Sequence, residues 1–114
     1  MAKGTAMTYN MHIEFIEAPI FSKLVYDYLN EDEYAAFQWT LAVSPKTGDV
    51  IPGSGGLRKI RWTAKGRGKR GGTRIIYYYQ QKNGEIWLIT IYAKNEAENI
   101  PLKTLKLIKE ALDI

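Results

Sequence analysis

The sequence contains no cysteine and a single histidine, His12. The absence of cysteine excludes disulfides, thiolate nucleophiles and thiolate metal sites, and it fits a reducing compartment. One histidine on a predicted strand is expected to be structural, so the usual acid–base pair of histidines is missing. The chain also lacks the run of about 18 apolar residues that a membrane-spanning helix needs, and residues 1–10 lack the apolar core of a signal peptide. We therefore expect one cytoplasmic domain with no membrane contact.

Acidic residues are missing from one stretch, Arg58–Arg74, which reads RKIRWTAKGRGKRGGTR. This stretch holds eight of the sixteen Lys and Arg residues and none of the twelve Asp and Glu residues. Concentrated positive charge on an otherwise acidic chain is typical of a polyanion-binding site, most often for nucleic acid. A solvated basic loop is the alternative. The stretch has no carboxylate pair for a metal ion and no phosphate-binding glycine motif, so neither a metal nor a cofactor is expected.

The periodicity of the apolar residues predicts elements in the order β-α-α-β-β-β-α. Strands are expected at 11–16, 57–63, 73–80 and 85–92. Helices are expected to open at Pro19, at a cap formed by Asn30 or Asp32, and at Asn99 to Pro101. These elements predict a small α+β domain with a four-stranded, mainly antiparallel sheet, an N-terminal helical hairpin and a C-terminal helix, with the helices covering one face. We expect residues 1–10 to be a tail and 11–114 to be the domain, with Trp39, Trp62 and Trp87 in the core.

Alternation along the strands predicts which face carries the charge. Side chains at every second position of a strand share a face, so Lys59 and Arg61 lie together and opposite to Ile60 and Trp62. If Arg74 of the next strand falls opposite Lys59 or Arg61, three cations converge on one part of the sheet. Such a cluster is costly unless an anion neutralises it, which favours polyanion binding over a solvated surface.

The runs GLRKIRWTAKGRGKRGGTRIIYYY and LITIYAKNEAEN, in this order, resemble the RelE/HigB toxins of bacterial type II toxin–antitoxin systems. The resemblance covers about residues 11–112 and is strongest to a HigB-like branch. It implies a RelE-like fold and a ribosome-dependent mRNA endoribonuclease (mRNA interferase) that enters the ribosomal A site and inhibits translation. It also implies a cognate antitoxin, which in the HigB branch is usually a helix-turn-helix DNA-binding protein.

The resemblance also assigns site residues by motif position. The implied catalytic residues are Lys59, Arg61, Arg74, Tyr92 and Lys94. The implied RNA-binding residues are Arg58, Lys65, Arg67, Lys69, Arg70 and Asn95. RelE itself has an arginine and a later tyrosine in the last cluster, whereas this chain has Lys94 and no tyrosine after Tyr92, so the division between acid and base stays open.

Metal-free RNA cleavage uses the ribose 2′-OH as the nucleophile, and it needs a base, a positively charged site for the phosphorane and an acid. Neighbouring positive charge favours a lysine as base, so we predict that Lys59 is the base. Arg61 and Arg74 are expected to stabilise the phosphorane, with Lys94 or Tyr92 assisting the leaving group. The alternative is that these residues bind the phosphate backbone and take no part in catalysis.

Two other functions stay open at this point. One is a ParE-like toxin that targets DNA gyrase, although such a protein does not need a convergent catalytic cluster. The other is a non-enzymatic RNA-binding module, which predicts binding without cleavage.

Overall fold

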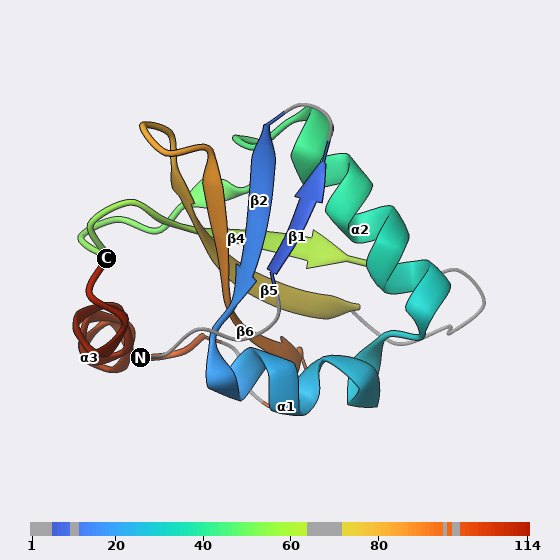
Figure 1. Cartoon of the computed structure of the whole chain (residues 1–114). Helices are drawn as coiled ribbons and strands as arrows, with labels where there is room; N and C mark the ends of the chain where they lie inside the picture. Colours follow the sequence, from blue (N-terminus) through green and yellow to red (C-terminus); the bar gives the residue numbers. More distant parts are fainter. Residues whose placement is uncertain (1–5, 10–11, 64–71, 95, 97–98) are drawn as a thin grey trace.

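The computed structural model describes residues 6–9, 12–63, 72–94, 96 and 99–114. Within these residues the chain forms six strands and three helices (Figure 1). The strands are β1 (Ala6–Tyr9), β2 (Ile13–Glu17), β3 (Asp49–Val50), β4 (Leu57–Trp62), β5 (Thr73–Gln80) and β6 (Glu85–Ala93). The helices are α1 (Pro19–Tyr28), α2 (Glu31–Val43) and α3 (Leu102–Leu112).

The strands form one mixed sheet in the order β1-β2-β6-β5-β4-β3. The strands β4, β5 and β6 make an antiparallel meander, and β2 joins it parallel to β6. The α+β class is confirmed, but the predicted number of four strands is too small, because β1 and β3 extend the two edges of the sheet. Residues 1–10 are predicted to be a tail, yet Ala6–Tyr9 pair antiparallel with β2. Where the domain begins stays a prediction.

The helical hairpin forms where the sequence predicts it. Pro19 occupies the first turn of α1, where its missing N–H costs no hydrogen bond. Asn30, one of the two predicted caps, begins α2 with a capping box. Its Oδ1 accepts from the Glu33 backbone N–H at 2.8 Å, and the Glu33 carboxylate accepts from the Asn30 N–H at 2.8 Å. This reciprocal cap fixes the turn between α1 and α2.

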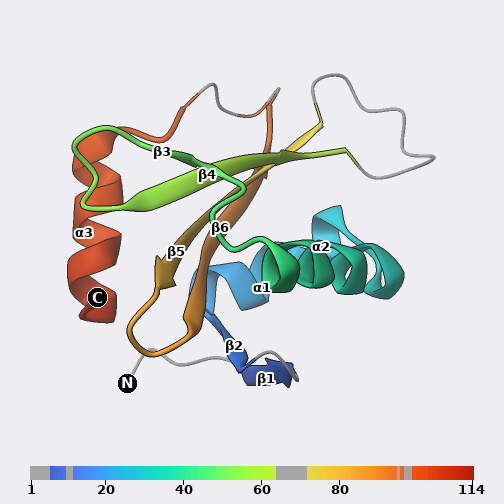
Figure 2. The same cartoon turned by 90° about the horizontal axis from the view of Figure 1, so that it is seen from above.

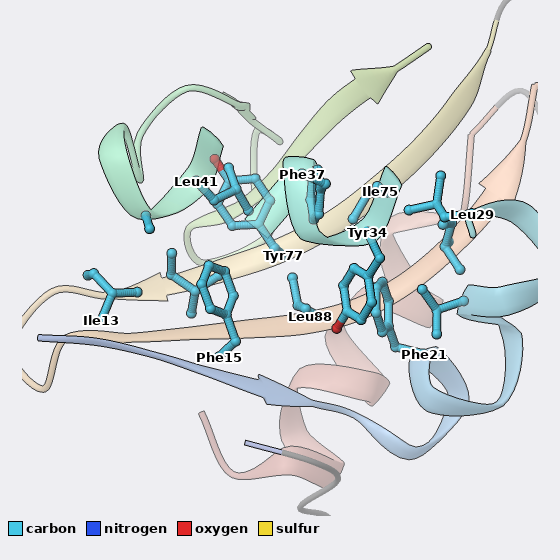
Figure 3. Close-up of a cluster of buried hydrophobic side chains, with 14 residues drawn as sticks. Ile13, Phe15, Phe21, Leu29, Tyr34, Phe37, Leu41, Ile75, Tyr77 and Leu88 are labelled. Atoms are coloured by element: carbon cyan, nitrogen blue, oxygen red, sulfur yellow. The ribbon is translucent and has the colours of Figure 1, made fainter. Parts of the chain in front are cut away.

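The helices α1 and α2 bury an apolar cluster against one face of the sheet. Phe21 of α1, Phe37 and Leu41 of α2, and Tyr77 of β5 are fully buried there (Figure 3). A buried carboxylate, Glu17, accepts hydrogen bonds from the hydroxyls of Ser22 and Tyr34, each at 2.5 Å. Burial and the bond to Glu17 raise the pKa of the Tyr34 hydroxyl. These two bonds join β2, α1 and α2.

The helix α3 covers the opposite face of the sheet, as Figure 2 shows. Leu105 and Leu112 of α3 pack there with Ile76 of β5 and with Trp87 and Ile89 of β6. The prediction that all helices lie on one face is therefore wrong. The central strands β5 and β6 are apolar on both faces, and each face needs a covering layer.

The three tryptophans differ in burial. Trp87 is buried, as predicted, and Trp62 is half-buried with its ring 5.3 Å from that of Phe37. Trp39 is 56% exposed, so the prediction that it lies in the core is wrong. It lies on the outer side of α2, since Tyr34, Phe37 and Leu41 form the inner side. None of the described helices is both long and apolar enough to cross a membrane.

Candidate functional site

The face of the sheet that carries α3 also gathers four of the five predicted catalytic residues. In the ladder, Arg61 of β4 lies directly opposite Arg74 of β5, and Arg74 lies directly opposite Tyr92 of β6. Residues directly opposite one another in antiparallel strands share a face. Lys59 precedes Arg61 by two positions and therefore lies on the same face. We call Lys59, Arg61, Arg74 and Tyr92 the basic cluster.

The basic cluster runs from the interior to the surface. Arg74 and Tyr92 are buried, at 9% and 7% exposure, whereas Lys59 is half-buried and Arg61 is exposed. Asp49 of β3 lies opposite Lys59 and borders the cluster with one acid. Arg61 and Arg74 thus place two positively charged side chains at directly opposite positions of the sheet, where like charges are unfavourable.

Asn99 is a further residue of the site, because it contacts Lys59. The sequence predicted it only as the start of the last helix. The Lys59 ammonium donates a hydrogen bond to Asn99 Oδ1 at 2.6 Å. Beside this bond lies a pocket of about 140 Å³ between the sheet and the start of α3. The pocket is lined by Ile51, Pro52, Lys59, Ile76, Tyr92, Asn99, Ile100, Leu102 and Leu105. Forty positions separate Lys59 from Asn99, so no local motif could have paired them.

Lys94 is exposed and directly follows β6. The chain after it is tied to α1, because the Tyr28 hydroxyl donates to Glu96 Oε1. The same Oε1 accepts from the Ala93 backbone N–H at 2.9 Å. The Tyr28 bond holds the pKa of Glu96 below its usual value, and burial together with that bond raises the pKa of Tyr28 to about 12. These bonds fix the chain on both sides of Lys94.

The predicted RNA-binding residues are not brought into the basic cluster by the described part of the chain. Arg58 lies on the other face of β4, where its guanidinium donates to the carbonyl oxygens of Lys46 at 3.1 Å and Gly48 at 2.7 Å. Five further predicted residues lie outside the described residues, namely Lys65, Arg67, Lys69, Arg70 and Asn95. An RNA contact by any of the six stays a prediction.

His12 lies far from the basic cluster. It is exposed, has a positive φ of 62°, and adjoins the β5–β6 turn at Gly84. This turn is at the other end of β5 from Arg74, a separation of roughly 20 Å at about 3.3 Å per residue. The single histidine of the chain therefore lies outside the basic cluster. Among the residues that the structure describes, no group of three His, Asp or Glu side chains is placed to hold a metal ion.

Comparison with known proteins identifies the fold and the family of this chain. The structure of a mutant of the Escherichia coli toxin RelE in the free state is similar to this chain, with a TM-score of 0.55 and 13% identity. The similarity covers 82% of this chain and 92% of the RelE chain, and it shows a RelE-like fold. The family described as the RelE toxin of the RelE/RelB toxin–antitoxin system matches residues 47–113. The chain therefore belongs to the RelE toxin family and is a toxin of a toxin–antitoxin system. Its place in a HigB-like branch stays a prediction.

Proposed function

We propose that this toxin is a ribosome-dependent endoribonuclease that cleaves messages during translation. The observation that carries the proposal is the row Arg61–Arg74–Tyr92 across three neighbouring strands, with Lys59 beside it. Membership in the RelE toxin family supports the same activity. The row offers two guanidinium groups for one phosphate and two further side chains that can exchange a proton.

The chemistry follows from these groups. The ribose 2′ oxygen attacks the adjacent phosphorus, and the bond from phosphorus to the 5′ oxygen breaks. The products carry a 2′,3′-cyclic phosphate and a 5′-hydroxyl. Lys59 is the candidate base for the 2′-OH proton, and Tyr92 or Lys94 is the candidate donor to the departing 5′ oxygen. Arg61 and Arg74 stabilise the negative charge of the phosphorane.

The ribosome is the proposed source of substrate alignment. Without a histidine pair at the cluster, proton transfer is slow, and cleavage depends on a message held with its 2′-OH in line with the scissile bond. The A site of a translating ribosome holds a codon in a fixed position. The proposed second partner is a cognate antitoxin, a helix-turn-helix DNA-binding protein if the HigB-like assignment holds. An antitoxin that covers the basic cluster needs a partly acidic surface.

Induction of the toxin in bacteria tests this proposal. Arg61→Ala is the main variant because Arg61 is exposed, and Arg74→Lys keeps the buried charge while removing the planar fork. Lys82→Ala, in the exposed turn at the other end of β5, is the matched charge control. We expect wild type and Lys82→Ala to arrest growth and cut translated messages, and the two arginine variants to do neither while remaining folded.

Other outcomes would redirect the assignment. Growth arrest with intact messages would favour a ParE-like toxin that targets gyrase. Binding of RNA without arrest or cleavage would favour a non-enzymatic RNA-binding module. Cleavage that persists in Arg61→Ala and Arg74→Lys would contradict the proposed site.

A further inference from the structure

The pocket between α3 and the sheet shares two residues with the basic cluster. Lys59 and Tyr92 line it, and Tyr92 lies directly opposite Arg74 in the ladder. A phosphate held by Arg61 and Arg74 therefore lies next to the mouth of the pocket. The base of a nucleotide is flat, and its two faces are largely apolar. It is therefore the part of a nucleotide that could enter an apolar pocket beside the bound phosphate.

The walls of the pocket are apolar. They come from three separate parts of the fold, the turn before β4, the strand β5 and the start of α3. The wall residues are Ile51, Pro52, Ile76, Ile100, Leu102 and Leu105. The volume of about 140 Å³ is a few times the roughly 30 Å³ that one water molecule occupies in the liquid. This volume suits one flat nucleobase, and it leaves the sugar and phosphate outside, on the basic cluster.

The hydrogen-bonding groups at the pocket have a defined direction. A lysine ammonium can only donate, so the bond from Lys59 Nζ fixes the Asn99 amide with Oδ1 toward Lys59. The two Nδ2 hydrogens of Asn99 are then the remaining amide donors, and Asn99 is exposed at the pocket. The groups offered to a ligand there are therefore mainly donors.

We propose that this pocket is a nucleobase subsite that favours a keto base over an amino base. Guanine presents the acceptor O6 and uracil the acceptor O4, whereas adenine and cytosine present an amino group at the corresponding position. Amino groups would face the donors of Asn99 and Lys59. The proposal rests on the proposed function for its biological meaning, because the base would be the one beside the scissile phosphate.

Titration of the full-length toxin with mononucleotides tests the subsite directly. Methyl signals of Ile51, Ile76 and Ile100 are followed by NMR while GMP, AMP or inorganic phosphate is added. We expect GMP to shift these signals and to bind on the order of tenfold more tightly than AMP. Inorganic phosphate is expected to leave them unchanged. Equal affinity for GMP and AMP, or pocket methyls that respond to neither, would overturn the proposal.

Two leucines of α3 provide a matched pair of variants. Leu102 lines the pocket and is 39% exposed, while Leu107 is 58% exposed and does not line it. We expect Leu102→Trp to fill the pocket and abolish the methyl shifts caused by GMP, and Leu107→Trp to leave them intact. If the pocket instead receives an apolar side chain of a protein partner, Leu102→Trp will leave nucleotide binding unchanged, which refutes the proposal.

Asn99→Ala separates recognition from binding. We expect this variant to lose the preference for GMP over AMP and still to respond to phosphate at the basic cluster. In cells, the cuts made by wild type should lie beside guanine or uracil, and Asn99→Ala should lose this bias. A wild type that cuts no message but discriminates GMP from AMP would refute the proposed function alone, and a wild type that cuts without base bias would refute the subsite alone.

Discussion

The free toxin should become more stable when one charge of the Arg61–Arg74 pair is removed. Arg61 is the residue to change, because it is exposed and Arg61→Gln leaves no buried group without its partner. Arg74 is almost fully buried and faces Arg61 directly across the ladder. Glutamine keeps much of the length and polarity of arginine, so the variant mainly changes the charge.

The size of the effect follows from the geometry. Opposite residues in an antiparallel pair have their Cα atoms about 5 Å apart, and we assume a separation of roughly 8 Å between the two charges at the ends of these long side chains. Two like charges at that distance repel by about 0.5 kcal/mol at the dielectric constant of water and by about 2 kcal/mol at an effective value near 20. Because Arg61 is exposed and Arg74 is buried, we expect a gain of about 1 kcal/mol, or about 4 °C in Tm.

Thermal and urea unfolding at low and high salt measure this gain. The Debye length, beyond which charges are screened from each other, is about 30 Å at 0.01 M salt and about 3 Å at 1 M. The gain in stability should therefore nearly vanish at high salt. Lys82→Gln removes an exposed charge in the β5–β6 turn and should change stability by less than about 0.5 kcal/mol. Added phosphate should stabilise wild type more than Arg61→Gln. An Arg61→Gln protein that is equally or less stable at low salt would refute the electrostatic account of the cluster.

Three further predictions concern the scaffold around the site. Tyr34→Phe removes one of the two hydroxyls that satisfy buried Glu17 and should cost about 1–3 kcal/mol in urea unfolding; an unchanged midpoint would contradict this. Gly84→Ala should cost about 1–3 kcal/mol, because φ is +66° and a Cβ would lie 2.5 Å from the His12 carbonyl oxygen; wild-type stability would show that the turn relaxes. The pKa of Tyr28 is raised to about 12, so its stabilising contribution is complete below pH 10 and is lost from pH 10 to 12. Tyr28→Phe should flatten this part of the pH–stability curve, and an unchanged slope would contradict the assignment.

Local signals predicted most of the fold. The β-branched and aromatic run of β5, the Asn-Gly turn before β6 and the Asn30 cap all depend on residues close in sequence. The strands β1 and β3 carry weak local patterns, since one has four residues and the other has two, and they exist through pairing with β2 and β4. The position of α3 depends on which face of the central strands remains uncovered, which is a property of the whole sheet.

The candidate site was predictable only in part. Alternation placed Lys59 and Arg61 on one face, but the register that sets Arg61 opposite Arg74 is a property of strand pairing. The contact between Lys59 and Asn99 joins residues that are 40 positions apart, so it depends on the tertiary fold. Trp39 was expected in the core, but the buried side of α2 is formed by Tyr34, Phe37 and Leu41, and Trp39 lies outside that stripe.

The most direct test of the account is cleavage of a defined message by the purified toxin on programmed ribosomes. We predict cuts in the A-site codon, ends that carry a 2′,3′-cyclic phosphate, and little cleavage of the same message without ribosomes. A single 2′-deoxyribose at the cut position should abolish cleavage, as should Arg61→Ala, whereas Lys82→Ala should not. Fast cleavage of the naked message, cleavage of the deoxy-substituted message, or an uncut message on stalled ribosomes would contradict the account.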